Sequence, residues 1–178
     1  MQVKALAPRF GLSCDSAAPR RTREAIVKVK EVMAPDVETV RSNQTVKEIA
    51  QRMDRQAIGY FPVCDRGRLV GVVTDRDITC RAVADGRDPV ATKIRDIMSK
   101  GVAYCFDDDD LAAAILLMEQ NCIRRIPVLD HKQRLVGVLS LTDIARVAPH
   151  RLTAELVEAV SRETPLSVTI NPAAEIQE

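Results

Sequence analysis

The sequence predicts an α/β (α+β) fold made of two tandem repeats, each a small sheet with packed helices, that form one pseudo-two-fold module. Two observations predict it. The phrase "GVVTDRDI" at residues 71–78 returns as "GVLSLTDI" at residues 137–144. A shift of 65 residues aligns "VKEVM" (29–33) with "IRDIM" (94–98), and after one inserted residue in a turn the shift becomes 66. Self-similarity at a fixed period indicates a duplicated structural unit.

Each repeat contains the same series of elements. Thr45 and Glu48 form a capping box ahead of a helix, and Asp110 begins the corresponding helix of the second copy. Two short apolar strands follow, "YFPVC" and "RLVGVV" in one copy and "RIPVL" and "RLVGVL" in the other. A second helix then runs to about Asp85 or Val147. Because a repeat of roughly 50 residues buries too little surface alone, we expect the pair to be the folding unit.

The pattern divides the chain into five parts. We expect a flexible N-terminal arm (1–24), a first repeat (25–86), a linker (87–93), a second repeat (94–148), and a C-terminal helix and tail (149–178). Within the last part, residues 151–162 fit an amphipathic helix with Leu152, Leu156 and Val160 on one side.

The composition excludes several classes of protein. The net charge of +1, the absence of Trp and the few Phe and Tyr argue against binding to nucleic acid. No apolar run reaches the roughly 20 residues that span a bilayer, and no signal-peptide stretch is present, so we expect a cytoplasmic protein that binds no membrane. The five cysteines form no CxxC pair, and neither histidine has zinc-ligand spacing, which predicts reduced thiols and no metal site.

The repeated phrase places a hydroxyl and a carboxylate three residues apart. Thr74 and Ser140 lie where a strand gives way to a helix, so that their hydroxyls can cap the helix beside free N–H groups that attract anions. Asp77 and Asp143 follow in the first turn, where a carboxylate can accept hydrogen bonds from both hydroxyls of a ribose. The alternative is purely structural, because a Ser or Thr followed by an acidic residue at this spacing is also a capping box.

The segments "VM", "PVxD", "LVGVVTDRDI" and "LVGVLSLTDI" together resemble a tandem cystathionine β-synthase (CBS) domain pair, or Bateman module, over about residues 28–148. The segment between the repeats is similar to the linker of small stand-alone bacterial members. The resemblance implies a disc-like body with two clefts between the repeats, which commonly bind adenine nucleotides. It also implies that two such pairs associate into a flat homodimer.

The resemblance also implies roles for particular residues. Thr74 with Asp77, and Ser140 with Asp143, would hold ribose and the adjoining phosphate. Arg124 and Arg125 precede Pro127 at positions where family members often carry basic phosphate ligands. The first repeat has Gly59 and Tyr60 there, so its cleft would rely on Arg76. The expected ligand-binding residues are Thr74, Arg76, Asp77, Arg124, Arg125, Ser140 and Asp143.

The function expected from these features is that of a non-catalytic regulatory module. It would bind AMP, ADP, ATP or NAD, because the arginines favour a phosphate-bearing ligand over S-adenosylmethionine. It would pass the ligand state to a separate effector protein or through a homodimer. Two alternatives stay open: a structural dimerisation module with degenerate clefts, and a thiol- or metal-dependent enzyme that uses the cysteines or the acidic run "FDDDDL" (106–111). We interpret that run as a helix start, where acidic residues stabilise the helix dipole.

Overall fold

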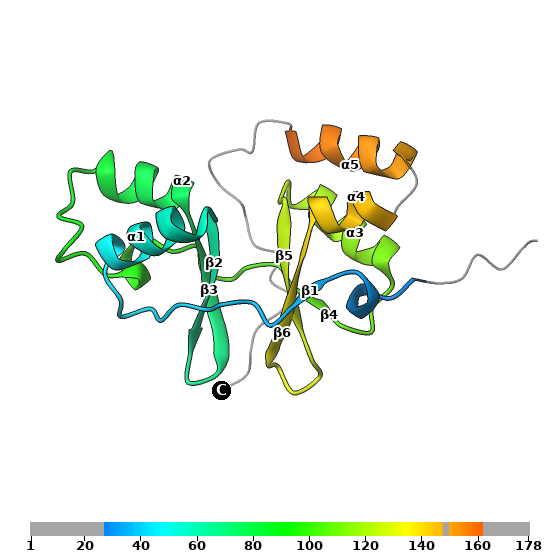
Figure 1. The fold of residues 1–178 in the computed structure, drawn as a ribbon, viewed down its shortest axis with the longest axis horizontal. Helices are drawn as coiled ribbons and strands as arrows, with labels where there is room; N and C mark the ends of the chain where they lie inside the picture. Colours follow the sequence, from blue (N-terminus) through cyan, green and yellow to red (C-terminus); the bar gives the residue numbers. More distant parts are fainter. Residues whose placement is uncertain (1–26, 148–149, 162–178) are drawn as a thin grey trace, which may run out of the picture.

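The computed structural model describes residues 27–147 and 150–161 (Figure 1). The expected N-terminal arm and the last residues of the tail (162–178) lie outside the described residues. In chain order the elements are η1 (Val29–Glu31), β1 (Ala34–Pro35), α1 (Val46–Gln56), β2 (Tyr60–Asp65), β3 (Arg68–Thr74), α2 (Asp75–Ile78), the π-helix η2 (Thr79–Val83), η3 (Ile94–Asp96), β4 (Cys105–Phe106), α3 (Leu111–Gln120), β5 (Arg125–Leu129), β6 (Leu135–Ser140), α4 (Leu141–Val147) and α5 (His150–Ser161).

Two small sheets lie side by side at the centre of the molecule, and the helices pack around them (Figure 1). The first repeat contributes the antiparallel hairpin β2–β3. The second repeat contributes the equivalent hairpin β5–β6, within a four-stranded sheet of order β1-β6-β5-β4. The mixed α/β architecture and its two-fold repetition confirm the predicted fold class. None of the described helices combines the length and apolar character that crossing a bilayer requires.

Each sheet is completed by a segment from the other repeat. Strand β1, from the start of the first repeat, pairs antiparallel with β6 of the second, so that Ala34 lies opposite Val138. In return Ser99, from the start of the second repeat, pairs with Val72 of β3. The Val72 N–H donates to the Ser99 carbonyl at 3.0 Å, and the Ser99 N–H donates back at 2.9 Å. The repeats are therefore joined by exchanged backbone as well as by side-chain packing.

The apolar core of each repeat includes side chains from the segment that the other repeat supplies. Val29, at the start of the first repeat, is fully buried in the core of the second repeat. Ile94 and Ile97, at the start of the second repeat, are buried in the core of the first. Burial of such a side chain contributes about 1.5–3 kcal/mol. Neither repeat can therefore complete its core without a segment supplied by its neighbour.

The glycine of each repeated phrase makes the exchange possible. Gly71 lies within β3 and Gly137 lies within β6. A Cβ at position 71 would lie 2.5 Å from the Ser99 carbonyl oxygen. A Cβ at position 137 would lie 2.6 Å from the Met33 sulfur and 2.8 Å from the Ala34 carbonyl oxygen. The close approach that requires glycine is thus made by the exchanged segments.

Substitution of these glycines should loosen the exchange. We expect Gly71→Ala and Gly137→Ala each to lower the free energy of unfolding by about 1–3 kcal/mol, since the added methyl group overpacks against backbone. Urea unfolding followed by circular dichroism measures this change. Lys100→Ala, at an exposed position beside Ser99, serves as the control and should stay within about 0.5 kcal/mol of wild type. Wild-type stability in both glycine variants would contradict the assignment.

Both predicted helix starts are confirmed, although the two N-cap side chains make different contacts. The predicted capping box of α1 is confirmed, with the Glu48 N–H donating to the Thr45 hydroxyl at 3.2 Å and the Thr45 N–H donating to the Glu48 carboxylate at 2.7 Å. Asp110 is the N-cap residue of α3, yet its carboxylate forms no cap hydrogen bond. It instead pairs with the Lys28 ammonium at 2.6 Å, which ties the acidic run to the exchanged segment.

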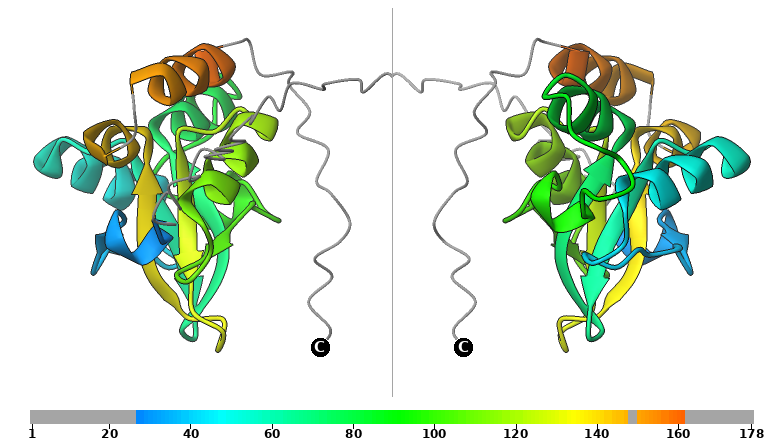
Figure 2. Two further views of the ribbon diagram at one scale, coloured as in Figure 1. Left: turned by 90° about the vertical axis from the view of Figure 1, so that its right-hand side faces the viewer. Right: turned by 90° about the vertical axis from the view of Figure 1, so that its left-hand side faces the viewer.

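The last described helix, α5, belongs to the second repeat. It forms at His150–Ser161, close to the predicted span of residues 151–162, and lies across α3 and α4 (Figure 2). Leu156 and Val160 of the predicted apolar face are buried in the core of the second repeat. The side chain of the third predicted residue, Leu152, lies outside the described ones. This helix makes the second repeat larger than the first.

Two neighbouring positions test whether α5 is an integral part of the fold. Leu156 is fully buried, whereas Val157 is 42% exposed. We expect Leu156→Ala to cost about 2–5 kcal/mol of unfolding free energy, because it leaves a cavity in the core. Val157→Ala should cost about 0.5 kcal/mol or less, as expected of an exposed site. Equal effects of the two substitutions in thermal unfolding would contradict the packing of α5.

Candidate functional site

The two hydroxyl residues of the repeated phrase occupy equivalent places. Thr74 ends β3 and lies opposite Tyr60 of β2, while Ser140 ends β6 and lies opposite Arg125 of β5. Each hydroxyl is therefore adjacent to the first residue of the neighbouring strand. The Arg125 guanidinium carbon lies 5.8 Å from the centre of the Tyr60 ring. This contact between equivalent positions brings the two candidate sites together where the repeats meet.

The hydroxyl residue and the carboxylate residue of the first phrase form hydrogen bonds with each other. The Asp77 N–H donates to the Thr74 hydroxyl oxygen at 3.1 Å, and that hydroxyl donates to Asp77 Oδ2 at 2.7 Å. The Thr74 N–H donates to the same carboxylate oxygen at 2.8 Å. This geometry is a complete capping box, and it fixes the direction of the Asp77 carboxylate.

The second phrase reproduces this arrangement. The Asp143 N–H donates to the Ser140 hydroxyl at 3.2 Å, and the Ser140 N–H donates to Asp143 Oδ2 at 3.0 Å. The Ser140 hydroxyl donates to the same oxygen. The phrase therefore serves as a helix-capping box in both copies. Capping alone cannot distinguish the two sites, and the difference lies in the second carboxylate oxygen.

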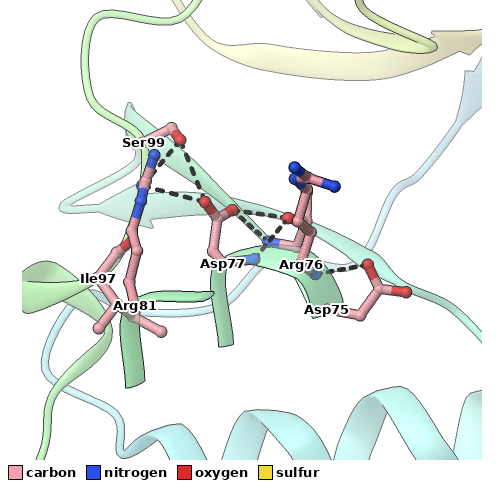
Figure 3. A network of polar contacts seen from close by, with 7 residues as sticks. Asp75, Arg76, Asp77, Arg81, Ile97 and Ser99 are labelled. Carbon is pink, nitrogen blue, oxygen red and sulfur yellow. Dashed lines mark hydrogen bonds and ion pairs between the residues drawn. The ribbon is translucent and has the colours of Figure 1, made fainter. Parts of the chain in front are cut away.

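In the first repeat the second oxygen is already bonded. Arg81 Nη1 lies 3.0 Å from Asp77 Oδ1, and the Ser99 hydroxyl donates to that oxygen at 3.4 Å. The same Arg81 nitrogen donates to the Ile97 carbonyl at 2.8 Å and to the Ser99 hydroxyl at 3.1 Å (Figure 3). Asp77 is a buried charged residue. Its burial is compatible with this full set of partners, because a buried charge requires compensation.

In the second repeat the corresponding oxygen has fewer and more distant partners. Arg146 Nη1 lies 3.6 Å from Asp143 Oδ1, on a side chain that is 74% exposed. Within the part of the chain that the structure describes, no hydrogen bond to Asp143 Oδ1 is formed. An exposed ion pair at this distance contributes little. Asp143 therefore retains an acceptor oxygen for another donor.

The predicted arginines are placed differently from one another. Arg125 lies beside Ser140 at the contact between the repeats. Arg124 is exposed, and its carbonyl accepts the Leu141 N–H at 3.0 Å at the start of α4. Arg76 is also exposed, and its guanidinium forms no hydrogen bond or ion pair with the residues described here. All three arginines are exposed, and among them Arg125 is distinguished by its place opposite Ser140 and its contact with the Tyr60 ring.

Tyr60 is a site residue that the sequence reasoning did not select. Its hydroxyl is buried and forms no hydrogen bond within residues 27–147 and 150–161. Burial raises the pKa of this phenol, and the nearby Arg125 opposes the shift only in part. The one available clue was its alignment with Arg125 at the start of equivalent strands.

The unpartnered hydroxyl leads to a stability prediction. We expect Tyr60→Phe to raise the midpoint of thermal unfolding, since a buried polar group without a partner costs about 1–3 kcal/mol. Tyr104→Phe is the control, because Tyr104 is half-buried and packs edge-on against Phe106. It should leave the midpoint unchanged. A lower midpoint for Tyr60→Phe would show that the hydroxyl has a partner in the folded protein.

Cys64, Cys105 and His131 lie outside the repeated phrases, and the exposed Cys80 follows the first phrase by two residues. Burial raises the pKa of Cys105 to about 12 and also raises that of Cys64, which keeps both thiols protonated near neutral pH. His131 pairs with Asp108 at 3.0 Å on the exposed surface. Among the described residues, no group of three or more His, Cys, Asp and Glu side chains is arranged to hold a metal ion.

Two shallow hollows lie outside the candidate site. One of about 270 Å³ opens over α3 beside Cys105, and one of about 410 Å³ lies between α3 and α5. Neither contains a residue of the repeated phrases. They follow from the apolar outer face of α3, where Leu116 is exposed, and they bring no candidate ligand residues together.

Comparison with known proteins identifies the fold. The sequence model of the CBS domain matches residues 29–82 and 94–150, together more than half of the chain. The CBS domain-containing protein YhcV of Bacillus subtilis (strain 168) is 40% identical over 117 residues, which cover 66% of this chain and 82% of YhcV. The chain therefore belongs to the CBS domain family and contains a pair of these domains.

Solved structures of related proteins have a similar fold. The crystal structure of Hypoxic Response Protein I with two coordinated zinc ions has a TM-score of 0.63 and 32% identity, covering 69% of this chain and all of that one. The CBS domain pair of protein MJ0100, in complex with 5′-methylthioadenosine and S-adenosyl-L-methionine, has a TM-score of 0.62 and 29% identity, covering 68% of this chain and 95% of that one.

Proposed function

We propose that this CBS pair is a non-catalytic regulatory module that binds an adenine nucleotide (AMP, ADP, ATP or NAD) between its repeats. The observation that carries the proposal is the hydroxyl–carboxylate pair that ends one strand in each repeat, where the repeats meet through Tyr60 and Arg125. The relative MJ0100, whose CBS pair was crystallised with two adenosine derivatives, supports an adenosine-bearing ligand.

The second repeat offers the better-formed chemistry for such a ligand. Asp143 is oriented by Ser140, and its Oδ1 remains available to accept hydrogen bonds from ribose hydroxyls. Arg125, directly across the ladder from Ser140, supplies a forked donor that suits a phosphate group. The exposed Arg124 is placed next to it for a longer phosphate chain. A ribose acceptor and a phosphate donor therefore lie on neighbouring strands.

Regulation follows if the ligand contacts both repeats. A nucleotide shifts a conformational equilibrium only when it binds two arrangements with unequal affinity. Arg125 lies against Tyr60 of the other repeat, so a phosphate that draws Arg125 away would alter the contact between the repeats. We propose that this change is passed on through a homodimer or to a separate effector protein.

Calorimetric titration with AMP and adenosine tests the proposal. Asp143→Ala should weaken both ligands about tenfold to a hundredfold, because hydrogen bonds to a charged group contribute roughly 1.5–3 kcal/mol. Arg125→Ala should weaken AMP and leave adenosine nearly unchanged, since only AMP carries an anion. Circular dichroism first establishes that each variant is folded.

Arg134→Ala is the control for the arginine substitution. Arg134 pairs with Asp130 in the β5–β6 turn, away from Ser140, and its loss should leave both titrations unchanged. If neither AMP, ATP nor NAD at millimolar concentration binds or raises the unfolding temperature of the wild type, the chain is a structural dimerisation module. A ligand at a hundred times its dissociation constant would add about 2.7 kcal/mol of stability.

A further inference from the structure

We infer that Arg81 and Ser99 block the first candidate site by occupying the carboxylate of Asp77, so that the chain binds its nucleotide only at Asp143. The inference rests on the proposed function and goes beyond it, because it states which of two similar sites accepts a ligand. It also makes Arg81 the residue that sets the binding stoichiometry.

All the acceptor capacity that Asp77 could offer to a ribose is already used. Oδ2 receives the Thr74 N–H and hydroxyl, and Oδ1 receives Arg81 and Ser99. The Asp77 side chain is 11% exposed, close to the 14% of Asp143, so the two sites differ in the partners of the carboxylate and not in its burial. A ribose hydroxyl would have to replace a guanidinium on a largely buried carboxylate. The exchange would replace an ion pair by a hydrogen bond from a neutral donor and would separate Arg81 from its carboxylate partner, so we expect it to be unfavourable.

Arg81 is held in place independently of Asp77. Its Nη1 also donates to the Ile97 carbonyl and the Ser99 hydroxyl, both on the segment exchanged from the second repeat (Figure 3). The guanidinium therefore joins the helix that follows Thr74 to the segment that bridges to β3 at Val72. Moving it aside for a ligand would break three contacts together, of which only one is with the carboxylate.

The second repeat lacks both of these partners. The 66-residue shift that places Asp77 on Asp143 places Arg81 on Val147, and the 65-residue shift places Ser99 on Ala34. Val147 and Ala34 are both exposed and apolar. Neither can donate a hydrogen bond to Asp143 from its side chain. The second carboxylate oxygen of the capping box is therefore bonded in the first repeat and available in the second. The reason is that Val147 and Ala34 stand where the other repeat has Arg81 and Ser99.

A contrary role for Arg81 is that of a phosphate ligand in the first cleft, and it makes the opposite prediction. If Arg81 bound phosphate, its removal would abolish a site. If it blocks the cleft, its removal creates one. Binding stoichiometry therefore separates the two roles.

The experiment is calorimetric titration of the full chain with AMP. We expect the wild type to bind a single AMP, and Arg81→Ala to bind a second one while the first keeps its affinity. Asp77→Ala in the Arg81→Ala background should remove that second site. Arg87→Ala is the matched control, because Arg87 is similarly exposed and pairs with Asp85 in the loop after η2. It should leave a single site.

The reciprocal change tests the same inference without weakening the first repeat. Val147→Arg combined with Ala34→Ser introduces the blocking pair beside Asp143, four residues along a helix and across the β1–β6 ladder. We expect this double variant to lose AMP binding at least tenfold. Because both positions are exposed, the variant should keep the wild-type unfolding temperature.

The outcomes separate the inference from the proposed function. A wild type that binds two AMP molecules, or an Arg81→Ala variant that binds only one or none, overturns the inference while the module remains a nucleotide binder. A wild type and variants that all fail to bind any adenine nucleotide overturn the proposed function, and the inference with it.

Discussion

The exchange of edge segments between the repeats is the constraint on which the rest of the structure depends. It determines that Gly71 and Gly137 have no side chain, since backbone from the other repeat passes where a Cβ would stand. It sends Val29 into one core and Ile94 into the other. It also carries Ser99 to Asp77, so the chemistry of the first candidate site is set partly by a residue from the second repeat.

Local features of the fold were predictable from the sequence because they depend on neighbours along the chain. The Thr45 capping box, the paired strands and the duplicated phrase arise from spacings of a few residues. The exchange was not predictable in this way. The pairing of Val72 with Ser99 joins residues separated by an entire helix and linker. No periodic pattern marks which sheet a two-residue edge strand will join.

The candidate site was predictable only in part, for the same reason. Thr74, Asp77, Ser140 and Asp143 were found because the phrase is repeated, and the structure places them as equivalent capping boxes. The difference at the first strand, Gly59 and Tyr60 against Arg124 and Arg125, was visible in the sequence, but the difference in the partners of Asp77 and Asp143 was missed. It depends on Arg81, one helical turn beyond the phrase, and on a long-range neighbour. Comparison of the two copies beyond the matched phrase would have shown Arg81 aligned with Val147.

The contact between Tyr60 and Arg125 has a consequence for how copies of the chain recognise one another. These residues hold the same position in the two repeats, so each faces its own counterpart across the pseudo-two-fold axis. If first repeats from two chains paired with each other, tyrosine would meet tyrosine. If second repeats paired, two guanidinium groups would meet and repel. Divergence at this one position therefore favours pairing of unlike repeats over pairing of like repeats.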